Sequence, residues 1–280
     1  MAVVAIVLAT ACAVVYGTAD FFGGLATRRS RVLAVVALTQ ITGLVFVLPL
    51  LPVLSGTPSA GALAWGVAAG LCGGLGVILF YRALAGGVMS VVAPTTATTS
   101  ATLPVLAGLA MGERPEAAAL CGVVLALAAV VLVSRSPGAP AGRATLSPIM
   151  QALASGLGFG AFFILLKQVP GDAGLWPLAG ARLASAIGAG ALALTTGRTL
   201  RPGKGALPAI IAAGILDMLA NVLYLLAVQR GLLAVVAVLA SLYPASTLLL
   251  ARYVLGERLS ALQTAGVGLA LGAVALIASA

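Results

Sequence analysis

The stretch 111–124, MGERPEAAALCGVV, returns 144 residues later as the stretch 255–268, LGERLSALQTAGVG. In both copies the shared Gly-Glu-Arg is followed by Gly-Val, nine residues after the glutamate. At the same offset, Val91-Val92-Ala93 aligns with Val235-Val236-Ala237. About twenty identities fall in the fifty or so residues that follow Leu79, several times what so skewed a composition gives by chance. The chain therefore contains an internal duplication.

The composition indicates that the duplicated unit lies in lipid. Hydrophobic residues make up 62% of the chain and charged residues 8%, and the mean hydropathy is +1.20, which is typical of membrane proteins. A spanning helix needs about 20 apolar residues. Ten runs meet this requirement: residues 3–26, 33–54, 60–81, 88–110, 117–134, 147–167, 174–195, 206–228, 232–253 and 259–279. Because the connections are short, no room remains for a soluble domain.

Each copy of the duplication holds five spans, the first in residues 1–137 and the second in residues 145–280. Five is odd, so the second copy enters the membrane from the opposite side. The expected fold is an all-α membrane protein with ten transmembrane helices in two inverted five-helix repeats. In transporters this symmetry lets two related conformations open one central site to either face. No basic stretch precedes the first span, which we expect to be retained rather than cleaved as a signal peptide.

The chain has a net charge of +9, and its basic residues are divided unevenly between the two sides of the membrane. Eleven basic residues lie in the gaps after odd-numbered spans: Arg28, Arg29, Arg31, Arg82, Arg135, Arg143, Arg198, Arg201, Lys204, Arg252 and Arg258. Three lie on the other side: Arg114, Lys167 and Arg230. The positive-inside rule explains this bias. The positive charge therefore indicates contact with a lipid bilayer and does not indicate binding to nucleic acid. The same rule places both termini outside.

Two aspartates lie inside predicted spans. Asp20 is eight residues before Arg28, so it lies roughly 12 Å below the interface that this arginine marks. Asp217 is thirteen residues from both Lys204 and Arg230, which centres it in its span. A charge at the bilayer centre costs about 3 kcal/mol, so such residues normally face a cavity or a partner. The alternative to a functional role is a structural ion pair with Arg82 or Arg182, or a carboxylate kept neutral by burial.

Further polar residues share helical faces with these carboxylates. Tyr16 is one turn before Asp20, and Asn221 and Tyr224 continue the face of Asp217 at i+4 and i+7. Arg182 lies about ten residues inside the seventh span, too deep for its side chain to reach the interface easily, and Gln40 takes the matching place in the second span. These residues can line one cavity.

Hydroxyl groups and prolines are concentrated in the fourth and ninth spans. Residues 94–104 read PTTATTSATLP and residues 241–247 read SLYPAST. Proline frees a backbone carbonyl, which the membrane tolerates where the helix faces protein or a cavity. We therefore expect a kinked, hydrated lining, although helix–helix hydrogen bonding also explains isolated threonines. The candidate lining residues are Thr95, Thr98, Thr99 and Tyr243.

The Gly-Glu-Arg turns, the two five-span repeats and the aromatic-Gly pairs Tyr16-Gly17 and Phe159-Gly160, 143 residues apart, resemble the EamA-type branch of the drug/metabolite transporter superfamily. Pro244 fits the proline that commonly lies thirteen residues before the repeat's glutamate, whereas Ser100 stands there in the first copy. Arg182 fits the arginine usual in the second span of each repeat.

In the first copy Thr39-Gln40 replaces that arginine. The resemblance implies cytoplasmic termini, the reverse of the charge count. Glu113 and Glu257 begin the loops before the fifth and tenth spans, where a carboxylate can favour the N-terminus of a helix. They are family markers, and we expect them to act as structural caps.

We expect a secondary transporter that exports a small polar metabolite, such as an amino acid, by alternating access in a bacterial inner membrane; direction and substrate class come from the resemblance. In this hypothesis Arg182 holds a substrate carboxylate, and Asp20 or Asp217 holds an amine or couples a proton. The nearest alternative is a proton-coupled exporter of cationic drugs, for which Phe21 and Phe22 offer aromatic faces.

Other function classes are poorly supported by the sequence. There is no histidine, and there are six acidic residues, so an intramembrane enzyme is not favoured. The cysteines Cys12, Cys72 and Cys121 lack the spacing of a metal site or a disulfide, and no P-loop indicates ATP-driven transport. We expect no cofactor and no metal. A pure scaffold would not need carboxylates near the midplane.

Overall fold

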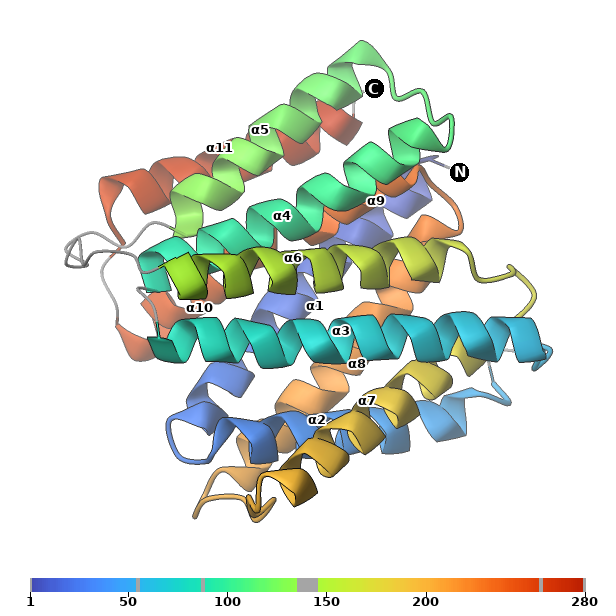
Figure 1. Ribbon diagram of the computed structural model, residues 1–280. Coiled ribbons are helices and arrows are strands. Elements are labelled where there is room, and N and C mark those ends of the chain that lie inside the picture. Colours follow the sequence, from blue (N-terminus) through green and yellow to red (C-terminus); the bar gives the residue numbers. More distant parts are fainter. Residues whose placement is uncertain (1, 54–55, 87–88, 135–145, 257–258, 279–280) are drawn as a thin grey trace.

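The computed structural model describes residues 2–53, 56–86, 89–134, 146–256 and 259–278. In these ranges the chain forms helices and no strand, which confirms the all-α prediction for them (Figure 1). The helices are α1 (Ala2–Thr27), α2 (Val32–Val47), the 3-10 turn η1 (Leu48–Leu50), α3 (Ala60–Gly86), α4 (Met89–Ala110), α5 (Ala117–Ser134), α6 (Leu146–Lys167), α7 (Trp176–Thr195), α8 (Leu207–Val228), α9 (Leu233–Ala240), α10 (Tyr243–Leu255) and α11 (Ala261–Ala278).

Within the described residues, seven segments are long and apolar enough to cross a membrane. The apolar stretches of α5 and α11, Ala117–Leu132 and Ala261–Ile277, are shorter. The ninth predicted span is broken into α9 and α10 by a turn at Ser241-Leu242. Pro244 has no N–H to continue the helical hydrogen bonds across this point. In the first copy α4 runs as one helix through the matching position, where Ser100 replaces the proline.

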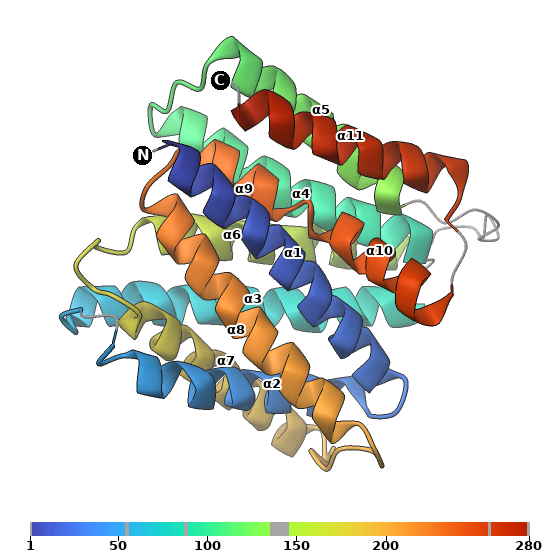
Figure 2. The same cartoon turned by 180° about the vertical axis from the view of Figure 1, so that it is seen from behind.

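The packing partners of the helices are exchanged between the two halves. Helix α1 packs along α8, and its counterpart α6 packs along α3, the counterpart of α8. In the same way α1 contacts α10, and its counterpart α6 contacts α4. Helix α2 contacts α8, and its counterpart α7 contacts α3. Figure 2 shows α1 and α8 side by side from behind. Each half of the chain therefore packs mainly against the other half.

Glycines allow several of these helices to approach closely, because a residue without a side chain lets two helix backbones come together. A Cβ on Gly66 would collide with the backbone of Pro177, and one on Gly70 with the backbone of Ala181. These two glycines bring α3 against α7. Gly17 has the same role where α1 crosses α10, because a Cβ there would lie 2.5 Å from Ser246 Cβ and 2.9 Å from Thr247 N.

The Gly17→Ala substitution is expected to destabilise the protein by about 1–3 kcal/mol, the usual cost of overpacking. The added methyl group would separate α1 from α10, and the 2.9 Å hydrogen bond from Thr247 Oγ1 to the Gly17 carbonyl would lengthen. Gly23→Ala on the same helix is the matched control, since a Cβ at Gly23 meets nothing within 4 Å. Thermal unfolding in detergent measures both, and equal melting temperatures would contradict the close crossing.

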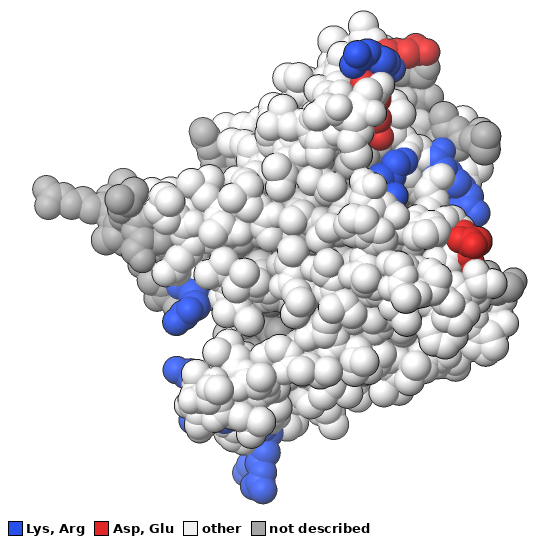
Figure 3. Space-filling view, turned by 45° about the vertical axis from the view of Figure 1, so that its right-hand side comes forward, with Lys and Arg blue, Asp and Glu red and all other residues white. Residues whose placement is uncertain are grey.

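The two ends of the helix bundle differ in charge. One end, called here the basic face, carries the described residues Arg28, Arg29, Arg31, Arg82, Arg198, Arg201, Lys204 and Arg252; Arg135, Arg143 and Arg258 lie outside the described residues. The other end, called here the mixed-charge face, carries Glu113, Arg114, Glu116, Lys167, Asp172 and Arg230. Figure 3 shows blue side chains alone at the left edge, and blue with red at the upper right.

The buried core is also distributed unevenly between these ends. The largest cluster takes in the first half of α1, the end of α6, the second half of α8 and all of α9, which lie toward the mixed-charge face. Among the described side chains, the clusters toward the basic face are smaller, as in the one formed by Ala26, Val35, Ala206 and Ile210. Figure 3 shows a hollow at the left edge, with Lys and Arg side chains above and below it. Among the residues whose side chains the structure describes, the largest core cluster thus lies toward the mixed-charge face, and the hollow lies at the basic face.

One cap differs from the sequence expectation. Glu113 precedes α5, but its carboxylate accepts hydrogen bonds from the backbone N–H groups of Leu233 and Ala234, at the start of α9. The expectation that Glu113 acts as a structural cap is confirmed, but the helix that it caps is α9, because the chain folds back and places the first turn of α9 within reach. Glu257, its counterpart, lies outside the described residues.

Candidate functional site

Arg182 is the centre of a polar cluster at the middle of the bundle. Its Nη2 forms an ion pair with Asp217 Oδ2 at 2.5 Å, a close charge contact rather than an aligned hydrogen bond. Its Nη1 donates to Gln40 Oε1 at 2.6 Å, and its Nε lies 3.2 Å from the sulfur of Met218. Helices α2, α7 and α8 thus meet at one guanidinium group. Of the ion pairs left open by the sequence, the structure forms the one with Arg182.

The two partners of the ion pair differ in exposure. The side chain of Arg182 is 8% exposed and that of Asp217 is 35% exposed. A buried arginine needs an opposite charge, because an unpaired ion in a low-dielectric interior is costly. Arg182 is therefore the buried partner of the pair, and Asp217 is the more accessible one.

A second set of contacts extends the cluster to α1 and α10. Tyr16 donates its hydroxyl proton to Asn221 Oδ1 at 2.8 Å, and Asn221 Nδ2 donates to the backbone carbonyl of Asp217 at 2.7 Å. The ring of Tyr16 meets the ring of Tyr243 edge to face, with centroids 6.3 Å apart. The structure therefore joins six of the predicted residues through direct contacts, Tyr16, Gln40, Arg182, Asp217, Asn221 and Tyr243.

Asp20 lies beside this cluster in an accessible position. It is one turn after Tyr16 on the same face of α1, the helix that packs against α8 and α10. Its side chain is nevertheless exposed. Among the described residues it takes part in no ion pair. The carboxylate of Asp20 is therefore accessible beside the buried polar cluster.

Two glycines that the sequence analysis did not consider let α2 and α8 close around Arg182. A Cβ on Gly43 would lie 3.3 Å from Arg182 Nε and 3.3 Å from the carbonyl of Gly214. A Cβ on Gly214 would lie 2.7 Å from the carbonyl of Thr39. Their positions offered a signal, because Gly43 is three residues after Gln40 and Gly214 three residues before Asp217. A small residue one turn from a polar one shares its helical face.

The remaining predicted residues have other surroundings. Tyr224 is buried, stacks on Phe163 with centroids 4.4 Å apart, and donates to the Phe163 carbonyl at 3.3 Å. Thr99 donates to the carbonyl of Thr95 in its own helix and lies against Gly156 of α6. Thr98 has a buried hydroxyl without a hydrogen-bond partner among the described residues. These side chains therefore lie in helix contacts of α4, α6 and α8.

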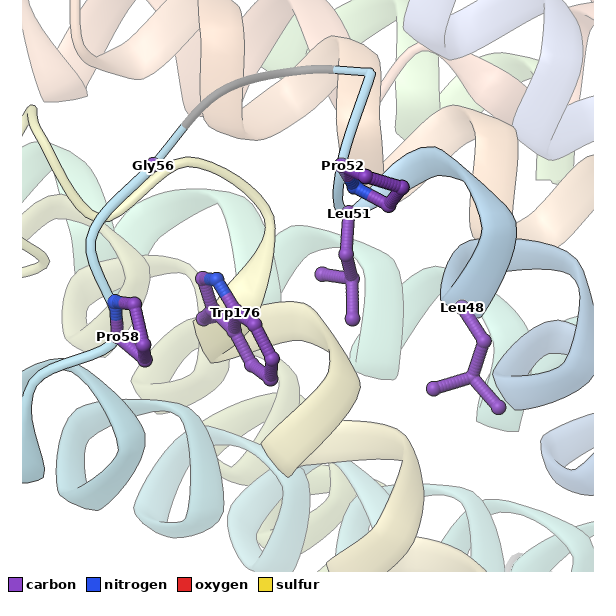
Figure 4. Close-up of a pocket in the computed structure, with 6 residues that line it drawn as sticks. All are labelled: Leu48, Leu51, Pro52, Gly56, Pro58 and Trp176. Atoms are coloured by element: carbon purple, nitrogen blue, oxygen red, sulfur yellow. The ribbon is translucent and has the colours of Figure 1, made fainter.

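Two surface pockets lie away from the cluster. One, of about 480 Å³, is lined by Leu48, Leu51, Pro52, Gly56, Pro58 and Trp176 (Figure 4). The other, of about 420 Å³, lies between α2 and α8 and is lined by Ile41, Thr42, Val45, Phe46, Ile211 and Ile215. Both linings are apolar and include none of the predicted site residues. Their chemistry suits contact with lipid and not the recognition of a polar solute.

Known proteins share this architecture. The family model described as the EamA-like transporter family matches twice, over residues 3–135 and 146–279. A solved structure whose title reads only "Crystal structure of protein" superposes with a TM-score of 0.78; it is 20% identical, and the match covers 97% of this chain and 95% of that chain. At this identity the likeness shows the fold alone. No curated protein matches.

Proposed function

Because the chain belongs to the EamA-like transporter family, we propose that it is a secondary active transporter that exports a small polar metabolite, such as an amino acid, across a bacterial inner membrane. Family membership indicates a multi-pass membrane protein that moves small molecules. The observation that carries the finer proposal is the cluster around Arg182 and Asp217, with the exposed carboxylate of Asp20 beside it.

Transport by this chain proceeds by alternating access between two inverted repeats, residues 1–137 and 145–280, with ten membrane spans. Five spans in each repeat support the inversion. The exchanged packing partners support it as well, because a two-fold axis in the membrane plane would relate α1–α8 to α6–α3. Arg182 and Asp217 come from the second repeat, while Tyr16, Asp20 and Gln40 come from the first. The cluster thus lies where the two repeats meet.

The distribution of the core among the described residues supports a conformation that is open at the basic face. Packing is dense toward the mixed-charge face, and the hollow lies at the basic face. If the basic face is cytoplasmic, as the positive-inside rule implies, this conformation is open to the cytoplasm. An exporter takes up its cargo in that conformation.

An amino acid matches the charges of the cluster. Its carboxylate replaces Asp217 as the partner of Arg182, which has hydrogen bonds or an ion pair at each of its three nitrogens. Its ammonium group then pairs with the released Asp217 or with Asp20. In this exchange Arg182 stays paired throughout, so no buried ion is left without a partner. Asp20 is the candidate for proton coupling, because it is accessible and has no ion pair among the described residues.

Export of cationic drugs is the second candidate, and one observation favours it. Arg182 is already neutralised by Asp217, so the accessible carboxylates give the cluster an anionic surface. Tyr16 and Tyr243 add aromatic rings that can contact a cation. The substrate would then exchange with protons at Asp20.

A metabolite screen in inside-out membrane vesicles tests the proposal. Vesicles with and without the protein are supplied with labelled amino acids, other small polar metabolites and cationic dyes. We expect the protein to cause accumulation of a polar metabolite, and a protonophore to abolish it. Accumulation of cationic dyes alone would establish the second candidate, and accumulation of no solute would contradict transport.

A further inference from the structure

The turn between α8 and α9, residues 229–232, is held from two sides by charged side chains. Lys167, the last residue of α6, donates from Nζ to the carbonyls of Val228 at 2.7 Å and Gly231 at 2.9 Å. Glu113 accepts from the N–H groups of Leu233 at 2.6 Å and Ala234 at 3.0 Å. Four charge-assisted hydrogen bonds therefore converge on this turn.

The signs of the two charges match the helix ends that they contact. The carbonyls at the C-terminus of α8 carry partial negative charge and are paired with an ammonium group, whereas the N–H groups at the start of α9 carry partial positive charge and are paired with a carboxylate. Gly108 makes room for this arrangement, because a Cβ there would collide with the carboxylate of Glu113. All eight residues of α9 are buried. The turn thus fixes a helix that fills the bundle below the mixed-charge face.

In the first repeat, glycine stands at the position of Lys167. The offsets of 143 and 144 residues that relate the two repeats place Gly24 and Gly23 at the position of Lys167. A Cβ at either glycine would meet nothing within 4 Å. Lys167 therefore bonds to the turn at the mixed-charge face, and the two glycines at the aligned positions of the first repeat lie in open space.

We propose that Lys167 and Glu113 form a latch that keeps the mixed-charge face closed, and that opening of this face requires Lys167 to release the carbonyls of Val228 and Gly231. The latch rests on the proposed function only in assuming a second conformation that is open at the mixed-charge face. It stabilises the closed form of the mixed-charge face and so favours the conformation that is open at the basic face.

Hydrogen exchange in lipid nanodiscs without substrate tests the latch through two segments. Segment 229–240 reports on the mixed-charge face, and segment 17–31 reports on the basic face. In Lys167→Met, exchange in 229–240 is expected to rise about tenfold, as the loss of one or two hydrogen bonds from a charged donor implies. Exchange in 17–31 is expected to fall, because the basic face closes when the other face opens.

Three further variants accompany this measurement. Lys167→Arg keeps the charge and should restore most of the protection in 229–240. Glu113→Gln should change the exchange rates of both segments in the same directions by a smaller factor. It provides the test if Lys167→Met does not fold. Arg230→Met removes an exposed cation at the end of α8 whose Nη1 bonds to its own helix at Leu226, and it should leave both segments unchanged.

The reciprocal change separates a latch from a simple stabilising contact. Faster exchange in 229–240 without slower exchange in 17–31 would show local loosening and overturn the proposal, as would no change in either segment. Because the measurement needs no cargo, it is independent of the metabolite screen. A failed screen with reciprocal exchange would leave the latch standing and remove the proposed transport function.

Discussion

The Arg182→Met variant is expected to lose about 3 kcal/mol of stability and all transport. The substitution leaves the carboxylate of Asp217 without its cation and Gln40 Oε1 without its donor. Removing one partner of a buried ion pair usually costs about 3–5 kcal/mol, and the partial exposure of Asp217 places this case at the lower end. Unfolding by a denaturing detergent in mixed micelles gives the free energy, and vesicle uptake gives the transport rate.

The double variant Arg182→Met with Asp217→Leu is the control for this prediction. Replacing both ions by apolar side chains of similar size is often neutral or stabilising, so most of the lost stability should return. Transport should not return, because the groups proposed to bind the substrate are gone. Normal uptake by either variant would show that the ion pair has no part in transport. A double variant as unstable as the single one would show that Arg182 acts through packing.

The Asp20→Asn variant is expected to abolish proton-linked flux and to leave protein level and stability unchanged. Asparagine keeps the shape of the side chain but can neither carry the charge nor release the proton. Because Asp20 is exposed and forms no ion pair among the described residues, its neutralisation leaves no buried charge without a partner. Uptake into proteoliposomes under an imposed proton gradient measures the effect.

Asp172→Asn provides the matched control for Asp20. Asp172 is an exposed aspartate in the loop between α6 and α7, where its Oδ2 lies 3.4 Å from Thr57 Oγ1. It lies at the mixed-charge face, outside the polar cluster, and should tolerate the same change. If Asp20→Asn and Asp172→Asn transported at equal rates, Asp20 would have no role in coupling.

Hydropathy and internal repetition predicted much of the fold, because both can be read directly from the sequence. The spans match the helices closely wherever an apolar run is bounded by charges or turns, as at α6 and α8. The break in the ninth span is also local, since it follows from Pro244. Contacts between distant segments were harder to predict. Nothing near Glu113 in the sequence indicates that it caps α9, more than a hundred residues away.

The candidate site was predictable in composition and less so in geometry. The cost of placing charge in lipid predicts that Asp217 and Arg182 turn inward, but it does not decide between a partner in the protein and a partner in the substrate. The structure pairs them with each other. The hydroxyl-rich run of α4 shows the limit of composition, because Thr99 makes an intrahelical hydrogen bond and packs on α6.

The most direct test of a hydrated pathway between the repeats is the accessibility of position 20. Asp20→Cys, in a chain whose Cys72 and Cys121 are replaced by alanine and whose Cys12 stays buried, is treated with a membrane-impermeant maleimide from one face at a time. We predict rapid labelling from the basic face and slow labelling from the mixed-charge face. Labelling from neither face, in a protein that remains folded, would place this residue in a dry or lipid-facing position and contradict the pathway.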